Sequence, residues 1–180
     1  MSELDGLIAL IPIGDIAKKL GIDEDIARAA IAVAVPVIVA GLAANAKGGG
    51  AKSLEKAVGG HAGKSTKLDD IDEADGEKIV NNVFGTQKSE VVKAAATKAK
   101  AKAEGVDMGA IVAKILPIIA PIVLAFLASQ LTKKPAAEED AAPAATGTDI
   151  GALLGGLLAS PEATSMIGGL LGGLLGGGKK

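Results

Sequence analysis

The sequence predicts an all-α protein, a multihelical bundle organised around two apolar helices. Two segments carry this prediction, residues 26–45 and residues 108–131, both built almost entirely from Ala, Val, Ile and Leu. Each contains proline within an apolar run of helical length, Pro36 in the first and Pro117 and Pro121 in the second. Because an interior proline removes a backbone hydrogen bond, we expect both helices to be kinked and to pack together at the centre.

The composition indicates a core of small aliphatic side chains. Of the 180 residues, 49% are hydrophobic, but only Phe84 and Phe126 are aromatic. The formal net charge is −2, so no overall field attracts nucleic acid or anionic lipid. The chain has no cysteine, which excludes disulfides, thiolate nucleophiles and zinc sites built on cysteine, and fits a reducing compartment.

The chain divides into three regions. Residues 1–132 form the predicted helical core, residues 133–148 a Pro/Ala/acid-rich linker, and residues 149–180 a Gly/Leu-rich tail. The linker has no periodic apolar pattern and is predicted to be disordered. Within the core we expect helices over residues 4–20 with a break at 12–14, 23–46, 53–58, 76–84, 89–104 and 107–131. The expected N-terminal caps are Asp15, Asp23, Asp75, Ser89 and Asp107.

The core contains an internal similarity. Residues 36–45 align with residues 121–130 at a spacing of 121 − 36 = 85, and Gly21-Ile22-Asp23 matches Gly105-Val106-Asp107 at a spacing of 84. Two interpretations remain open: a weak duplication of 21–45 as 105–130, or convergence on one way to pack an apolar helix.

The apolar helices are interpreted as buried helices of a soluble bundle and not as membrane spans. Residues 115–128 give only 14 uncharged positions, about 21 Å of helix, against the roughly 30 Å of a bilayer core. The N-terminus, MSELDGL, is acidic where a secretory signal needs positive charge. We therefore expect a cytoplasmic protein, with a membrane-peripheral location as the alternative.

No motif for catalysis, a cofactor or a metal is complete. His61 is the only histidine and lies among glycines, where we expect a turn. An EF-hand register starting at Asp70 fails because Gly76 falls one place too late. Gly63-Lys64-Ser65 lacks the first glycine of a phosphate-binding loop, since that position is Val58. We expect no enzymatic activity and no cofactor.

Binding of nucleic acid is not expected either. Residues 16–27 resemble the start of a helix-turn-helix, but the following helix is apolar where a DNA-reading helix is polar. The lysines between residues 93 and 102 have no arginine or aromatic residue beside them, so at most a loose phosphate contact is expected.

The tail carries the candidate interaction residues. Its leucines recur at i, i+1, i+4 and i+5, which places them on one face of a helix with glycines opposite. The eight leucines are Leu153, Leu154, Leu157, Leu158, Leu170, Leu171, Leu174 and Leu175. Each interior glycine costs a helix about 1 kcal/mol relative to alanine, so the tail needs a surface to bind. The alternatives are its own core, another copy, a partner groove, or a membrane with Lys179 and Lys180 near headgroups; otherwise the tail is disordered.

Together these segments resemble the YidB-like DUF937 family of bacterial proteins of unknown function. The resemblance lies in Pro36, the Gly/Leu tail and the segments IAKKLGID (16–23), GLAAN (41–45), GGH (59–61), DGEKI (75–79), VFG (83–85) and LPIIAP (116–121). It implies an all-α fold and supplies no catalytic residues. The lysine-rich helix at 93–102 departs from the family pattern, in which polar residues of the glutamine type are expected.

We therefore expect a non-enzymatic bacterial protein that works through apolar self-association or partner binding by its tail. The alternatives are a membrane-peripheral protein anchored by that tail and a weakly DNA-associated protein.

Overall fold

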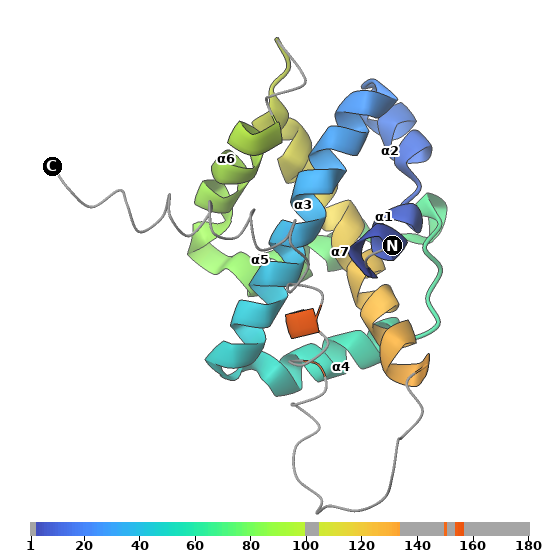
Figure 1. Cartoon of the computed structure of the whole chain (residues 1–180), viewed down its shortest axis with the longest axis vertical. Helices are drawn as coiled ribbons and strands as arrows, with labels where there is room; N and C mark the ends of the chain where they lie inside the picture. The colour runs from blue at the N-terminus through green and yellow to red at the C-terminus, as the bar shows by residue number, and fades with distance from the viewer. Residues whose placement is uncertain (1–2, 100–104, 134–149, 151–153, 157–180) are drawn as a thin grey trace, which may run out of the picture.

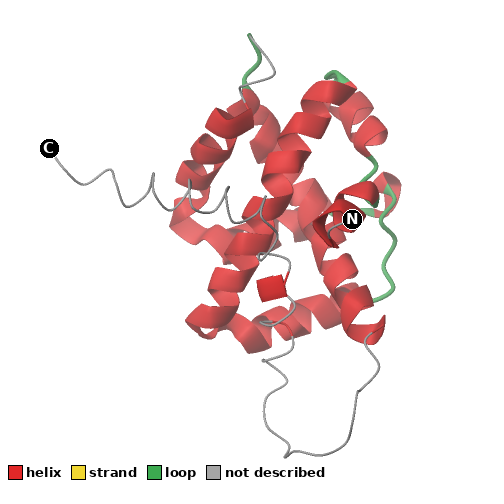
Figure 2. Ribbon diagram, viewed as in Figure 1, coloured by secondary structure: helices red, strands yellow, loops and turns green. Residues whose placement is uncertain are grey.

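The computed structural model describes residues 3–99, 105–133, 150 and 154–156. Among these residues every regular element is helical and none is a strand (Figure 2). The predicted all-α fold class is therefore confirmed. The longer helices are α1 (Glu3–Ala9), α2 (Ile13–Leu20), α3 (Glu24–Asn45), α4 (Ala51–His61), α5 (Glu73–Phe84), α6 (Lys88–Ala99) and α7 (Met108–Lys133). Three short helical turns connect them: η1 (Ala46–Gly50), η2 (Leu68–Asp70) and η3 (Gly85–Gln87).

Helices α3 and α7 form the centre of the bundle, as predicted. They run side by side through the middle of the molecule, and α4 crosses beneath their lower ends (Figure 1). Helix α7 contacts α3, α4, α5 and α6, and every residue from 118 to 128 is buried. A helix that is apolar on all sides is stable in water only when neighbours cover all sides, and the surrounding helices provide that cover.

The interior prolines do not interrupt either central helix. Helix α3 continues through Pro36, and α7 continues through Pro117 and Pro121. Since Pro121 has no N–H, the carbonyl of Pro117 lacks its usual partner four residues later. A Cβ built on Gly76 of α5 would lie 1.8 Å from that carbonyl oxygen. The glycine therefore allows the α5 backbone to pack directly against the carbonyl that the proline leaves free, where a weak Cα–H···O contact can form.

Several predicted helix ends are confirmed. Gly21 ends α2 in the left-handed conformation at φ 66°, as a C-terminal glycine does. Asp23 is the N-cap residue of α3, without a side-chain capping bond. The Asp107 side chain accepts a hydrogen bond from the Ala110 N–H at 3.1 Å at the start of α7. Gly49, at φ 96°, breaks the helical path between α3 and α4 near the predicted end.

Three predicted caps are wrong. Pro12 is the N-cap residue of α2, so Asp15 lies in the first turn instead. Helix α5 starts three residues before the predicted position, because the Asp72 Oδ1 accepts the N–H groups of Ala74 and Asp75 at 2.9 and 3.2 Å. Ser89 lies inside α6, which follows η3 directly.

Two helical stretches are long and apolar enough to cross a membrane by length and composition, Glu24–His61 and Met108–Leu131. In the bundle, 67% and 78% of their most apolar windows are buried against the rest of the protein. Burial of this extent is what core helices of a water-soluble bundle also show, so the stretches alone establish no location.

Candidate functional site

The tail reaches the helical core through two apolar side chains. Ile150 and Leu154 are 2% and 0% exposed and belong to the same contiguous cluster of buried residues as α3 and α7. Figure 1 draws the turn containing Leu154 in orange, above α4. Of the eight candidate leucines, Leu154 is thus placed in the core cluster. The remaining candidates, Leu153, Leu157, Leu158, Leu170, Leu171, Leu174 and Leu175, lie outside the described residues.

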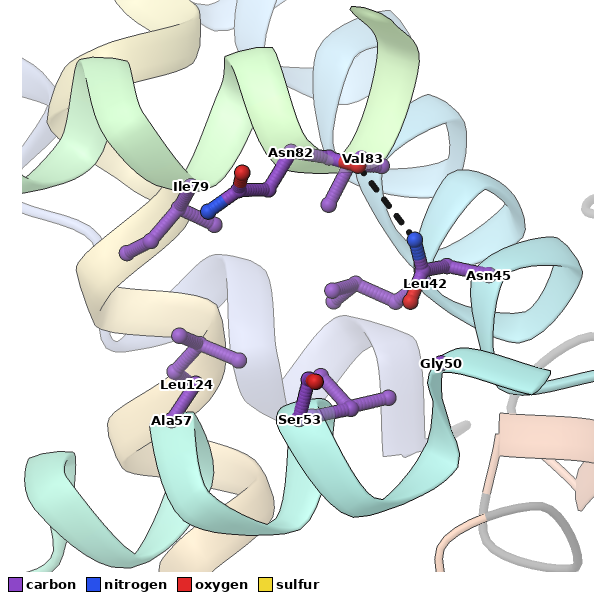
Figure 3. A pocket seen from close by; sticks show the side chains of 10 residues that line it. Leu42, Asn45, Gly50, Ser53, Ala57, Ile79, Asn82, Val83 and Leu124 are labelled. Carbon is purple, nitrogen blue, oxygen red and sulfur yellow. Dashed lines mark hydrogen bonds between the residues drawn. The ribbon is translucent and has the colours of Figure 1, made fainter. Parts of the chain in front are cut away.

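A cavity of about 290 Å³ opens between α4, α5 and the end of α3, and Leu124 of α7 lies in its floor. Its floor is apolar and includes Leu42, Leu54 and Leu124, each of which is at most 5% exposed. Its rim carries polar side chains from all three helices (Figure 3). The full lining is Leu42, Asn45, Gly50, Ser53, Leu54, Ala57, Ile79, Asn82, Val83 and Leu124. An apolar floor with a polar rim suits an aliphatic group attached to a hydrogen-bonding backbone.

The rim of this cavity is fixed by one cross-helix hydrogen bond. The Asn45 side-chain amide donates to the Asn82 backbone carbonyl at 3.3 Å, which joins the end of α3 to α5 (Figure 3). A Cβ built on Gly50 would lie 2.0 Å from the Asn45 Oδ1, so the lack of a side chain at Gly50 leaves the space that this amide occupies. The Ser53 and Asn82 side chains are exposed at the rim, where they can meet a bound group.

His61 does not lie in a turn, as the sequence suggested, but is buried at the end of α4. Its Nδ1 lies 2.7 Å from the Ala57 carbonyl oxygen, and its Nε2 lies 2.8 Å from the Asp75 Oδ2. The side chain is 7% exposed and that of Asp75 is 35% exposed. The pair therefore joins α4 to α5 across the buried side of α4.

The surroundings of His61 do not form a nucleophilic triad in this geometry. His61, Asp75 and Ser65 line one cleft with Lys64 and Asp72. Both ring nitrogens of His61 are already occupied, one by the Ala57 carbonyl and one by Asp75. A catalytic histidine must keep one nitrogen available to take the proton of the nucleophile. The His61–Asp75 pair is therefore best understood as a link between helices.

The acidic residues at 69–77 have local structural roles. Asp69 and Asp70 lie in the short turn η2, Asp72 caps α5, and Asp75 bonds His61. Within the described part of the chain, no group of three or more His, Asp or Glu residues is arranged to hold a metal ion.

These features define a class of protein: a helical bundle built on aliphatic packing, with a cavity at one end and two residues of its C-terminal region, Ile150 and Leu154, buried in its core cluster. The model of the family described as "Bacterial protein of unknown function (DUF937)" matches residues 4–130. The chain belongs to this family, as its segments suggested. No curated protein and no solved structure matches the chain.

Proposed function

We propose that this chain is a non-enzymatic assembly protein whose Gly/Leu tail binds the helical core of the same chain or of a second copy. The observation that carries the proposal is the burial of Ile150 and Leu154 in the core cluster. These residues follow a 16-residue segment, 133–148, that has no apolar periodicity. A tail that rejoins the core after such a segment has an affinity of its own for that surface.

Binding through leucines explains why the tail combines leucine with glycine. Full burial of one leucine side chain contributes about 1.5–3 kcal/mol, whereas each glycine costs a helix about 1 kcal/mol. The tail therefore gains order only when its leucines find an apolar surface. Free in water it has little reason to fold, so its state depends on the surface available to it.

Exchange of tails between copies would convert this intramolecular contact into self-association. The segment 133–148 spans at most about 50–60 Å when extended, which exceeds the width of a core of this size. A tail can therefore cover its own core or an identical surface on a neighbour. Exchange of an identical element is a low-cost route to dimers because no new interface is needed.

The absence of enzymatic activity is part of the same proposal. The one histidine uses both ring nitrogens in structural bonds, and the nearby carboxylates cap or link helices. The proposed location is the cytoplasm. DNA binding is not favoured, since the lysines at 93–102 have no arginine or aromatic companions.

Light scattering of the full-length protein at several concentrations tests the proposal. We expect the mass of the parent protein to rise from one chain toward two or more as concentration increases. A variant with Leu170, Leu171, Leu174 and Leu175 changed to serine should remain a monomer over the same range. A control variant with Lys179→Gln and Lys180→Gln should behave like the parent. Tail-driven assembly would be contradicted if the mass of the parent did not depend on concentration. It would also be contradicted if the mass of the serine variant rose with concentration as that of the parent does.

A membrane-peripheral protein is the second candidate. It is supported by the leucine-rich tail, in which Lys179 and Lys180 follow the second leucine repeat. In that case the tail leucines would enter lipid and the lysines would contact headgroups.

A further inference from the structure

We propose that the cavity between α3, α4 and α5 is the binding site for the second leucine repeat of the tail, residues 168–175 of the same chain. This inference rests on the proposed function. It adds which surface of the core is bound and which repeat of the tail binds it.

The tail contains two copies of one short pattern. Residues 151–158 read GALLGGLL and residues 168–175 read GGLLGGLL. The first copy contains Leu154, which is buried in the core cluster. The second copy offers the same leucines at i, i+1, i+4 and i+5, so it has the same need for an apolar surface.

The size and chemistry of the cavity suit a few aliphatic side chains. Its volume of about 290 Å³ lies at the lower limit of small-molecule sites, which span about 300–1,000 Å³. Leu42, Leu54 and Leu124 supply an aliphatic floor. A helix that docks in a groove inserts side chains spaced by three or four residues, which is the spacing of Leu170 with Leu174 and of Leu171 with Leu175.

The polar rim supplies hydrogen-bonding side chains, which a segment of glycine and leucine lacks. Asn82 and Ser53 are exposed beside the cavity, and Asn45 is held at its rim by the bond to the Asn82 carbonyl. In a helix each backbone carbonyl oxygen keeps a second lone pair, and beside glycine no side chain shields it, so amide and hydroxyl donors at the rim can bond it. The rim therefore matches a Leu/Gly helix at both its apolar and its backbone surfaces.

The length of the chain permits this placement. The second repeat is separated from Gly156 by residues 157–167, which are 11 residues. They span at most about 40 Å, while a core of this size has a radius of gyration of about 14 Å. Binding within one chain is favoured because a short connection gives an effective concentration in the millimolar range.

Disulfide trapping in the full-length protein tests the assignment, because the natural chain has no cysteine. The test variant combines Ser53→Cys at the cavity rim with Leu171→Cys in the second repeat. The control combines Ser89→Cys in α6 with the same Leu171→Cys, and both serines are exposed. Under mild oxidation at low protein concentration we expect the Ser53 pair to form an intrachain disulfide at least about tenfold faster than the Ser89 pair.

Equal rates for the two pairs would overturn the assignment of the second repeat to this cavity. A faster rate for the Ser53 pair that yields mainly covalent dimers at low concentration would overturn the assignment to the same chain. The mass measurements on the cysteine-free parent decide the proposed function separately. If the mass depends on the tail but the two trapping rates are equal, the assembly proposal holds. Only the assignment of the second repeat to this cavity is then overturned.

Discussion

At the scale of single residues, the closest helix contacts depend on glycines that no turn requires. Gly76 faces the Pro117 carbonyl, and a Cβ built on Gly41 of α3 would lie 2.5 Å from side-chain atoms of Val83 and Phe84. Both glycines have helical backbone conformations, so their role is proximity and not backbone freedom. Proline and glycine thus act together: one frees a carbonyl in α7, and the other brings α5 against it.

Replacing Gly76 by alanine should lower the free energy of unfolding by about 1–3 kcal/mol or more, because α5 must move away from α7. Gly59→Ala in α4 is the matched control, since nothing lies within 4 Å of its added Cβ and its backbone is helical. That change should raise stability by up to about 1 kcal/mol. Urea unfolding of the three proteins measures both effects. Equal stability of the Gly76→Ala variant and the parent would contradict the close contact.

The sequence could predict few of these residue contacts. Gly76 follows an aspartate, and the sequence pattern predicts it at the start of a helix, where glycine has no special meaning. Its role depends on Pro117, which lies 41 residues away (117 − 76) with no pattern that joins the two. The same is true of His61 and Asp75, which pair only because α4 and α5 pack together.

At the scale of elements, the bond between buried His61 and half-buried Asp75 joins α4 to α5, and the Lys19–Glu73 ion pair joins α2 to α5. The Lys19–Glu73 pair is nearly half exposed and therefore contributes little, since exposed ion pairs are worth about 0–1 kcal/mol. The histidine is different, because it is buried and uses both nitrogens. Removal of Asp75 leaves the buried Nε2 of His61 without its partner, and removal of His61 leaves the half-buried carboxylate of Asp75 without its partner.

We expect His61→Ala and Asp75→Ala each to lower the free energy of unfolding by about 1–3 kcal/mol. The double variant should lose less free energy of unfolding than the sum of the two single losses. The difference, about 1–2 kcal/mol, is the coupling energy, because both single changes remove the same bond. The cap variant Asp107→Ala serves as a control and should add to His61→Ala without coupling, since it acts at the start of α7. Chemical unfolding measures all of these values, and strictly additive losses at 61 and 75 would contradict a direct bond.

The elements themselves were largely predictable, and their boundaries less so. Long apolar runs and flanking glycines predicted α3 and α7 because burial and helix termination are local properties of the chain. The start of α5 was misplaced because Asp72 and Asp75 are both suitable caps, and only the fold decides between them. Asp75 is drawn to His61, which leaves Asp72 to bond the free N–H groups. No pattern in the sequence indicates the cavity, because its lining residues come from four helices that only the fold brings together.

At the scale of the whole molecule, burial of aliphatic side chains stabilises the bundle, and two tail residues are buried in the same way. The two central helices cover each other and are covered by α4, α5 and α6. Ile150 and Leu154, which follow the linker in the sequence, add their apolar side chains to the same cluster. If the other tail leucines bind the core as proposed, the apolar groups of core and tail cover one another without lipid.

Flotation with liposomes tests this account most directly, because it separates burial within protein from burial in lipid. The full-length protein and the variant with serine at positions 170, 171, 174 and 175 are each mixed with anionic vesicles and centrifuged through a density gradient. We predict that both proteins stay at the bottom without detergent. Flotation of the full-length protein but not the variant would show a lipid-binding tail, and flotation of both would place the central helices themselves in the membrane. Either result would contradict the account.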